Sequence, residues 1–303
     1  MVAISRKGNF IMHDICILLK RLLYISGCLL VMVFFLPFEK GVCADFNYFG
    51  TLQEKLVSEG FEREKIVLIY QSPQVFFDTK GVSLFFVHRE ASLNYSQFPS
   101  QLHLAAAKIY MKRYEEELSK TEEIYGVDRE VITAIILVET KFGQSLGKRQ
   151  VINTLSTMAS LSDANVRKRF WEEISGSTTL SFDAFEKKAL DKSSWAYREL
   201  KALLRYTEKE EIDIFKIPGS YAGAVGIPQF MPSNIIRFAA DGNMDGRIDL
   251  FEHADAIAST ANFLKKAGWY RGIDNEKAKK VIRQYNPSSY YIDTILQVAQ
   301  MLK

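Results

Sequence analysis

One glutamate lies on the apolar side of a helix that we predict within residues 127–143. Glu139 follows Ile132 by seven residues and Ile135 by four, so the helical repeat places its carboxyl group among apolar side chains. A carboxyl group that has lost its hydration keeps its proton to higher pH, as a general acid working near neutral pH must. The pattern therefore indicates proton donation by Glu139. A structural glutamate paired with a buried Lys or Arg is the alternative.

Two further stretches have the composition of a ligand site. "GSYAGAVGIPQFMPSN" (219–234) is rich in glycine and alanine, which fill a core poorly but let the backbone approach another group closely. Gln229 adds a hydrogen-bonding group, and Pro232 is expected to begin a helix. "RQYNPSSYY" (283–291) combines tyrosines with an amide, a mixture that binds sugars. A tight glycine-rich turn and an aromatic core cluster are the respective alternatives.

The segment "DGNMDGRIDLFEHAD" (241–255) has the pattern of a single calcium-binding loop. Gly246 stands sixth, where such a loop turns sharply, and Glu252 stands twelfth, where a bidentate acid is usual. Carboxylates that face one another repel without a cation, so the spacing predicts one bound calcium ion. The spacing alone does not distinguish a calcium sensor from a structural site. Oxygen-bearing side chains recur at alternate positions: Asp241, Asn243, Asp245 and Asp249.

The composition excludes some partners. The chain has 303 residues, of which 48% are hydrophobic and 25% charged, as in ordinary globular proteins. The first 44 residues carry the formal net charge of +3, and the remainder holds equal numbers of basic and acidic residues. A neutral body argues against nucleic acid as a partner. All three cysteines (Cys16, Cys28 and Cys43) also lie in that N-terminal segment, so the body has neither a disulfide nor a thiolate metal site.

The N-terminal segment itself has the features of an export signal. The basic pair at 20–21 precedes an apolar run of about signal-peptide length, and Val42 and Ala44 fit the rule for small residues before a cleavage site. We predict a signal peptide over residues 1–44. The alternatives are lipoprotein processing at Cys28 in "ISGC" and an uncleaved membrane anchor. All three export the body from the cytoplasm.

Helical periodicity dominates that body, and strand alternation is scarce, so the expected fold class is mainly α. Residues 80–100 are predicted to be irregular. Residues 102–125 are predicted to form one helix stopped by Gly126, after which Asp128 caps the next helix. Further helices are predicted at 48–59, from Glu62, and near 151–161, 166–175, 182–190, 194–208, 232–239, 252–267, 275–284 and 288–302.

Residues 126–159 and 219–269 resemble the membrane-bound lytic transglycosylase B family, whose members cleave peptidoglycan. The motifs "VET" and "GSYAGAVGIPQFMPS" carry the resemblance in this order and at this spacing, and it covers about residues 50–303. It implies a lysozyme-like (α+β) catalytic core with a helical N-terminal subdomain and a single EF-hand-type calcium loop.

The implied domain organisation follows from the same resemblance. Residues 45–303 would form the catalytic domain after the signal peptide. Within it, a helical part at about 45–120 would precede the lysozyme-like core at about 121–303, and the calcium loop 241–255 would lie inside that core.

The resemblance also assigns roles to single residues. Glu139 corresponds to the only catalytic acid of the family, and Ser220 to a serine near that acid and the substrate's N-acetyl group. Tyr95 corresponds to an upstream tyrosine, although the spacing there differs by one residue. The remaining substrate-binding positions, two that contact glycan and the "YN" motif with its later tyrosine, are Gln229, Phe230, Tyr285, Asn286 and Tyr291.

The implied calcium ligands follow the loop pattern with one open choice. The family places its bidentate acid at the fifteenth position, which is Asp255, whereas the generic loop places it at Glu252. The other ligands would be Asp241, Asn243, Asp245 and the carbonyl group of Arg247.

Two features depart from the family pattern. Only fifteen residues separate Trp269 from Tyr285, so we expect the small β-rich insertion common in the family, and the substrate contacts it provides, to be absent here. The family's paired arginines have their nearest match in "RKR" (167–169), displaced by about three residues. This cluster would bind acidic groups of the substrate, or would be a solvated helix face.

The resemblance implies a lytic transglycosylase. A single acid would cleave the β-1,4 bond between N-acetylmuramic acid and N-acetylglucosamine, and the muramoyl C6 hydroxyl would close a 1,6-anhydro ring. The alternatives are a hydrolytic muramidase of the same fold and a noncatalytic calcium-stapled glycan-binding module. We expect a periplasmic monomer that binds peptidoglycan glycan strands, with membrane anchoring through the N-terminus as an open alternative.

Overall fold

The computed structural model describes residues 46–87 and 94–303. The predicted signal peptide and its two alternatives lie outside the described residues. All described helices and strands belong to one compact unit, Tyr48–Lys303. Within the described part of the chain, no helix is both long and apolar enough to cross a membrane.

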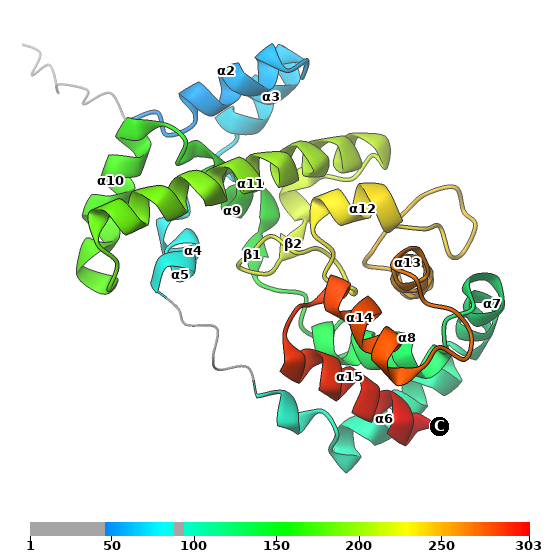
Figure 1. Ribbon diagram of the computed structural model, residues 1–303. Helices are drawn as coiled ribbons and strands as arrows, with labels where there is room; N and C mark the ends of the chain where they lie inside the picture. Colours follow the sequence, from blue (N-terminus) through cyan, green and yellow to red (C-terminus); the bar gives the residue numbers. More distant parts are fainter. Residues whose placement is uncertain (1–45, 88–93) are drawn as a thin grey trace, which may run out of the picture. The chain divides into compact units, whose positions relative to one another are not determined.

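The described unit is mainly helical, with one short antiparallel ribbon in which β1 (Arg149–Gln150) pairs with β2 (Pro218–Gly219) (Figure 1). The helical segments, in chain order, are α2 (Gly50–Ser58), α3 (Arg63–Gln71), α4 (Thr79–Val82), α5 (Leu84–Val87), η1 (Tyr95–Gln97), α6 (Gln101–Arg113), α7 (Glu115–Tyr125), α8 (Arg129–Thr140), α9 (Val151–Ser160), α10 (Ala164–Ile174), η2 (Ser175–Ser177), α11 (Phe182–Lys209), η3 (Ile214–Lys216), α12 (Pro232–Phe238), α13 (His253–Lys266), α14 (Asn275–Tyr285) and α15 (Ser289–Leu302).

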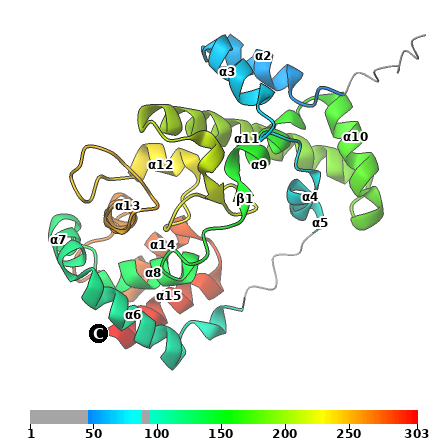
Figure 2. The same ribbon diagram turned by 180° about the vertical axis from the view of Figure 1, so that it is seen from behind.

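Two buried helices organise the core. α9 buries every one of its residues and packs along α11, while α8 buries all residues from Val131 to Leu137 and packs along α15. Figures 1 and 2 show both pairs side by side. A helix that is buried on all sides has to be surrounded by other elements, so α8 is a central helix, and its last turn carries Glu139.

Several helix ends lie where the sequence predicts them. α7 ends at Tyr125, and Gly126 follows in the left-handed conformation with φ 68°. α12 begins at Pro232, as predicted. Asp128 occupies the N-cap position of α8, but its carboxylate makes no capping bond there and instead accepts a hydrogen bond from Trp269 Nε1 at 3.1 Å.

Two predicted helix boundaries are wrong. The helix predicted over 102–125 is interrupted at Tyr114, and the three glutamates that follow, Glu115, Glu116 and Glu117, form the acidic first turn of α7. Acidic side chains stabilise the positive N-terminal end of a helix, so the three consecutive glutamates in the sequence indicate that a new helix begins there. The segments predicted at 182–190 and 194–208 form a single helix, α11.

Residues 80–100, predicted to be irregular, contain the short helices α5 and η1. The preceding α4 is capped by Asp78, whose Oδ1 accepts from Gly81 N–H at 2.8 Å. Asp78 Oδ2 also pairs with Arg149 Nη1 at 2.6 Å. Because Arg149 begins β1, this buried acid fixes α4 to the ribbon.

Glycines let two backbone segments meet beside β2. Gly147 has φ 94°, and a side chain there would collide with the backbone of Gly219 and Ser220. A side chain at Gly219 would collide with the Ala224 carbonyl group and with Val151. The close backbone approach predicted for the glycine-rich stretch is therefore confirmed, and its contact is another part of the same chain.

We expect Gly147→Ala to lower the free energy of unfolding by at least about 2 kcal/mol, because it adds a backbone collision to a strained φ. Gly60→Ala is the matched control: Gly60 has φ 95° but nothing within 4 Å of the added carbon. It should cost only about 1 kcal/mol. Chemical denaturation measures both, and equal losses would refute the close approach.

Candidate active site

Glu139 lies half-buried in the last turn of α8, facing α15. Its Oε1 accepts a hydrogen bond from the hydroxyl group of the fully buried Tyr291 at 2.7 Å. Loss of hydration raises the pKa of Glu139 to about 7, although the Tyr291 hydrogen bond acts in the opposite direction. Glu139 forms no ion pair with a Lys or Arg of the described chain, so the alternative of a glutamate paired with a buried Lys or Arg is wrong. An acid with this pKa can donate a proton near neutral pH.

The chain makes a turn just after Glu139. Lys141, Phe142 and Gly143 have positive φ angles of 50°, 62° and 82°. Such a run is strained unless neighbouring groups hold it. Thr140 does so: its buried Oγ1 donates to the Ile227 carbonyl group at 2.9 Å and accepts from Gly143 N–H at 3.0 Å. The end of α8 is thereby fixed to the glycine-rich stretch.

Further contacts connect this turn to the predicted calcium loop. The Ile227 N–H donates to the Leu250 carbonyl group at 2.8 Å. The Tyr110 ring stacks on Phe142 at 4.3 Å, and the Tyr110 hydroxyl lies 3.1 Å from His253 Nδ1, just beyond Glu252. Sequence reasoning missed this network. A polar residue directly after the acid, Thr140, was the only local signal, since the other partners are distant in sequence.

The predicted tyrosines gather around Glu139. The Tyr95 ring meets Tyr291 edge-on at 6.1 Å, and the Tyr285 ring lies parallel to Tyr291 at 6.4 Å. Burial raises the pKa of Tyr285 and Tyr291 well above the usual value, so both hydroxyl groups stay protonated. The Tyr285 hydroxyl donates to the Pro228 carbonyl group, and Asn286 Oδ1 accepts from Ser288 N–H at 3.0 Å.

Ser220 and Gln229 lie on the glycine-rich stretch and are half-exposed. Ser220 Oγ accepts from the N–H groups of Ala222 and Ala224 at 3.2 and 3.1 Å, so its own hydrogen is free to be donated elsewhere. Gln229 has a strained φ of 50°, and its Nε2 donates to the Gly226 carbonyl group at 2.8 Å. The carboxamide oxygen of Gln229 therefore remains as an acceptor.

Phe230, which the resemblance assigns to glycan contact, is in the core. Its ring is only 2% exposed and lies 5.7 Å from Phe263 and 5.8 Å from Tyr285. A ring buried to this extent packs against the Tyr285 ring and is not accessible for stacking on a sugar. The structure therefore corrects this assignment.

The predicted calcium loop is shaped by its own acids. Asp241 accepts from the N–H groups of Met244, Asp245 and Gly246 at 2.6, 3.2 and 2.8 Å. Asp255 is 1% exposed and accepts from Gly242 N–H at 2.8 Å and from Asp249 N–H at 2.7 Å, so it closes the loop from inside.

The other predicted ligands lie nearer the solvent. Glu252 Oε2 accepts from Asn243 Nδ2 at 3.0 Å, and Asp245 Oδ2 accepts from the same nitrogen at 3.1 Å. The Arg247 side chain pairs with Glu211 at 2.7 Å, outside the loop, and forms no described ion pair with the acids of the loop. Within residues 46–87 and 94–303, no three His, Cys, Asp or Glu side chains are arranged to hold a metal ion.

The carboxyl groups of the loop also affect one another electrostatically. Loss of hydration and then the charges of Asp249, Asp255 and Asp245 raise the pKa of Glu252. Loss of hydration raises the pKa of Asp255, although backbone hydrogen bonds from Asp249, Gly242 and Asn243 act in the opposite direction. The charge of Asp241 contributes a smaller increase. Acidic neighbours are thus among the causes that raise the pKa of both carboxyl groups.

The "RKR" cluster was predicted to bind acidic substrate groups or to form a solvated helix face. Its first residue, Arg167, does neither. Arg167 is 8% exposed, donates to the Leu161 carbonyl group at 2.8 Å and pairs with Glu186 at 3.2 Å. This guanidinium group thus joins the loop before α10 to α11, and is neither a ligand group nor a solvated face. Lys168 and Arg169 are exposed.

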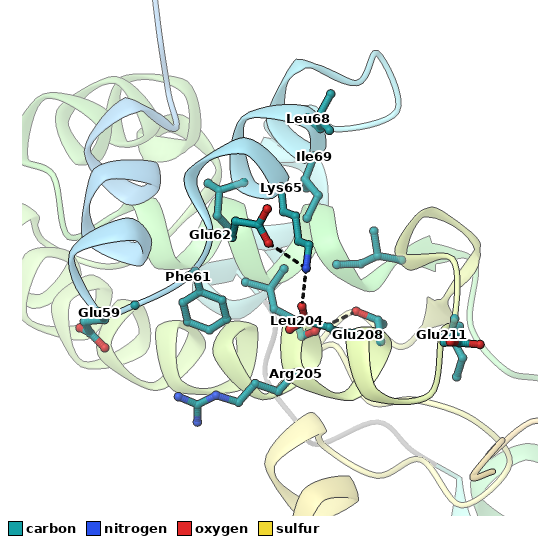
Figure 3. Close-up of a pocket in the computed structure, with 15 residues that line it drawn as sticks. Glu59, Phe61, Glu62, Lys65, Leu68, Ile69, Leu204, Arg205, Glu208 and Glu211 are labelled. Carbon is teal, nitrogen blue, oxygen red and sulfur yellow. Dashed lines mark hydrogen bonds and ion pairs between the residues drawn. The ribbon is translucent and has the colours of Figure 1, made fainter. Parts of the chain in front are cut away.

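A groove of about 670 Å³ lies away from Glu139, between α3 and the C-terminal half of α11 (Figure 3). Lys65 bridges it by pairing with Glu62 at 2.9 Å and Glu208 at 2.8 Å. None of the predicted site residues lines it. Its central charges are matched across the groove, so it lacks the uncompensated acid of the Glu139 site.

Comparison with known proteins adds independent information. The model of a family described as "Transglycosylase SLT domain" matches residues 47–277. Membrane-bound lytic murein transglycosylase B of Escherichia coli (strain K12) is 34% identical over 164 residues, which is 54% of this chain. The match spans 38% of the length of that relative.

Solved structures with similar folds include soluble lytic transglycosylase SltB1 from Pseudomonas aeruginosa, with a TM-score of 0.68 and 22% identity over 83% of this chain and 97% of that one. Escherichia coli lytic transglycosylase Slt35 in complex with calcium has a TM-score of 0.66 and 20% identity over 86% of this chain and 93% of that one. These likenesses confirm the predicted mainly helical, lysozyme-like fold.

We expect Glu139→Gln to stabilise the protein at high pH only. The pKa of Glu139 is about 7 in the folded state against 4.5 for a free side chain, so its charge destabilises the fold as pH rises through 7 and not below 4.5. Above pH 7 the substitution should add about 2–3 kcal/mol to the free energy of unfolding. Denaturation across pH measures this, with Glu130→Gln on the same helix as control. An equal gain in the free energy of unfolding at acidic pH would contradict burial of the Glu139 charge.

Proposed function

Since the chain belongs to the transglycosylase SLT domain family, we propose that it is a lytic transglycosylase acting on peptidoglycan. It would cleave the β-1,4 bond between N-acetylmuramic acid and N-acetylglucosamine and leave 1,6-anhydromuramic acid ends. One observation carries the proposal: Glu139 is a half-buried acid with a pKa of about 7, and the hydroxyl group of the buried Tyr291 donates a hydrogen bond to it at 2.7 Å. Two-carboxylate glycosidases need a second acid in contact with the substrate, whereas this reaction needs one.

In the first step, protonated Glu139 donates its proton to the glycosidic oxygen as the bond to C1 breaks. Positive charge then develops at C1, and the substrate's own N-acetyl group stabilises it. Ser220 would orient that group by donating its free hydroxyl hydrogen to the acetamido carbonyl oxygen, since the oxygen of Ser220 is already occupied by two backbone N–H groups.

In the second step, ionised Glu139 accepts the proton of the muramoyl C6 hydroxyl group while the C6 oxygen bonds to C1. The hydrogen bond from Tyr291 supports the ionised form of Glu139, so the same carboxyl group can act first as acid and then as base. Attack within one sugar has a high effective molarity, which favours ring closure over attack by water.

The proposed substrate contacts are half-exposed groups of the predicted site. Ser220, the carboxamide oxygen of Gln229, Asn286, Tyr95 and Tyr285 would face the glycan. Phe230 and Tyr291 are buried and would support the contact residues from behind. This division is consistent with the burial of each side chain and extends the family roles only to positions that a sugar can reach.

We further propose that residues 241–255 bind one structural calcium ion. Oxygen atoms of Asp241, Asn243 and Asp245, the Arg247 carbonyl group and a bidentate acid would hold it, with Asp255 favoured over Glu252. The acids recur at the spacing of a calcium loop, and the solved Slt35 structure is described as a complex with calcium. Through Leu250 and Ile227, the loop is joined to the glycine-rich stretch.

The proposed place of action is the periplasm. The N-terminal sequence has the features expected of an export signal, and the similar Escherichia coli protein is named as membrane-bound. The protein would act on glycan strands as a monomer, either released from its signal peptide or anchored at the membrane. The division into a helical part at about 45–120 and a core at about 121–303 belongs to the same proposal.

We expect Glu139→Gln to lower the rate of peptidoglycan cleavage at least about 100-fold while leaving glycan binding intact. In the unaltered protein, cleavage should decline as pH rises through about 7, because the protonated form of Glu139 begins the reaction. Mass spectrometry of digested peptidoglycan should find anhydro ends, lighter than hydrolysed ends by one water molecule.

Three outcomes separate this proposal from other activities of the same fold. Residual activity above a tenth of the original rate would remove Glu139 from its role. Products whose reducing ends carry oxygen from solvent would identify a muramidase. Binding without any turnover would identify a glycan-binding module.

We expect a calcium chelator to lower the melting temperature while a cool assay retains much of the activity. Binding to the folded state alone stabilises it by about 2.7 kcal/mol at a hundred times Kd. Calcium titrations of Asp255→Ala and Glu252→Ala identify the bidentate acid as the one whose loss abolishes this stabilisation. An identical melting curve with and without chelator would leave the segment as an acidic surface turn.

A further inference from the structure

Helix α6 carries apolar side chains on two opposite faces. On its inner face, Ala107 and Tyr110 are buried where the helix packs against α8 and α15. On its outer face, Leu102 is 78% exposed and Ile109 is 70% exposed. The exposed Ala105 lies between them, and the helical repeat aligns all three in one stripe. Apolar side chains that are aligned at a surface, unlike ones scattered singly, indicate a face that binds a partner.

Cationic side chains lie on both sides of this stripe. Lys108 and Lys112 follow one edge of it and Arg113 lies at the other, as the helical repeat requires. All three are exposed, and none of them forms an ion pair with a carboxylate anywhere in residues 46–87 and 94–303. The sequence of α6 contains neither Asp nor Glu. We give the name α6 face to the exposed set formed by Leu102, Ala105, Lys108, Ile109, Lys112 and Arg113.

The nearest acids along the chain belong to another helix. Glu115 and Glu116 are exposed, but the backbone leaves the helical conformation at Tyr114, with φ −112° and ψ 35°. The helix α7 that follows packs against α13 and does not continue the line of α6 (Figures 1 and 2). The positive charge of the α6 face is therefore uncompensated along the helix, and acids adjoin it in the sequence only at its C-terminal end.

A bilayer surface with anionic lipids matches both parts of the α6 face. The aliphatic side chains of an interfacial helix enter the boundary between headgroups and acyl chains, and Lys and Arg beside them bind the anionic headgroups. A soluble anionic polymer would bind the cations but leave Leu102 and Ile109 in water. A second copy of this chain on the same face would bring two sets of three cations together, which repel. Of these three occupants, the bilayer alone uses the apolar stripe and the cations together.

Contact through the α6 face leaves the proposed catalytic site open. Figures 1 and 2 both draw α8 and α15 between α6 and the ribbon of β1 and β2. Ser220 directly follows β2, and the glycine-rich stretch continues from there. A protein that lies on α6 therefore keeps the glycine-rich stretch on the side away from the bilayer.

We propose that the α6 face binds the surface of a bilayer that contains anionic lipids. Leu102 and Ile109 enter the headgroup boundary, and the three cations bind lipid headgroups. The proposal goes beyond the proposed function, because it concerns the surface on which the protein is held and not the bond that it cleaves. It is also separate from any anchoring through the N-terminus, because the folded body makes this contact.

The first test measures whether the apolar stripe reaches the acyl chains, in the full chain with the same N-terminus in every variant. Leu102→Trp is mixed with vesicles of phosphatidylglycerol and phosphatidylcholine, in which the phosphatidylcholine chains carry bromine near the headgroup and quench nearby tryptophan. The emission of the unaltered protein, which has three tryptophans, is subtracted. The added tryptophan should lose most of its emission, as should Ile109→Trp. Leu68→Trp, at a 69% exposed leucine of α3, is the matched control and should keep its emission.

The second test measures the contribution of the cations. In Leu102→Trp, replacing Lys108, Lys112 and Arg113 by Gln should raise the lipid concentration for half-maximal quenching roughly 100-fold, because each cation near an anionic surface contributes roughly fivefold. Vesicles of phosphatidylcholine alone should give the same result with the cations in place. The matched control removes three exposed lysines that lie elsewhere and form no described ion pair, and it should quench like Leu102→Trp: Lys168, Lys187 and Lys280.

Several results would overturn the lipid contact in variants with parental melting curves. These are equal quenching at positions 102 and 68, no quenching at 102 or 109 with any vesicle, and quenching that the triple substitution leaves unchanged. If the triple substitution instead weakens binding to intact peptidoglycan without any quenching by vesicles, the α6 face binds an anionic glycan. If it converts a dimer of the unaltered protein into monomers, the occupant is a second copy.

Cleavage of peptidoglycan separates this proposal from the proposed function. The variants of the α6 face should cleave peptidoglycan in solution like the unaltered protein, because none of the substituted residues belongs to the proposed catalytic site. Normal cleavage without quenching refutes the lipid contact alone. Quenching at position 102 without cleavage by the unaltered protein refutes the proposed function and supports the lipid contact.

Discussion

The hydrogen bond from Tyr291 to Glu139 joins two residues that are 152 positions apart in the sequence. It is made within the contact between α8 and α15, where water is displaced and an ionised carboxylate is costly. The neutral Tyr291 hydroxyl group stabilises the ionised carboxylate of Glu139 by a hydrogen bond, but it does not keep Glu139 ionised at neutral pH. A lysine or arginine in place of Tyr291 would keep Glu139 deprotonated and remove its ability to donate a proton. The surrounding tyrosines and phenylalanines preserve that balance because they exclude water without adding charge.

The second requirement of the site is that backbone segments meet at short distance. Thr140 fixes the end of α8 to Ile227, and the contact of Gly147 with Gly219 brings the following segment to Ser220. These contacts use backbone carbonyl and N–H groups together with one buried hydroxyl, so their geometry is set by the fold and not by flexible side chains. The acid and the serine are held by the same small set of turns, which explains why glycine and positive φ angles gather there.

The features that could be predicted from the sequence are those that depend on the spacing of nearby residues. Glu139 could be placed on an apolar helix because the helical repeat is a local property, and Gly126 and Pro232 act on their own helices. Phe230 could not be recognised as a core residue, since its burial depends on Phe263 and Tyr285, which approach only in the folded chain. The break at Tyr114 accompanies a stack with His253, at 4.5 Å, that no local pattern reveals.

The same limit applies to charged groups. Arg167 satisfies carbonyl groups of the preceding turn and pairs with Glu186 on α11, a pairing that helical periodicity within α10 cannot anticipate. For the calcium loop, the sequence specifies the acids but the choice between Asp255 and Glu252 depends on the ion itself. Both therefore remain predictions, whereas the fold class and the family are established.

The left-handed run at Lys141, Phe142 and Gly143 has a consequence for how this protein can evolve. The Phe142 conformation is tolerable because Tyr110, on a different helix, holds its ring, and Tyr110 is held in turn by His253. A substitution at position 110 is therefore expected to increase the backbone strain at position 142, close to Glu139. Positions 110, 142 and 253 are expected to covary among relatives, and substitutions accepted singly elsewhere in α6 would be accepted here only in matched sets.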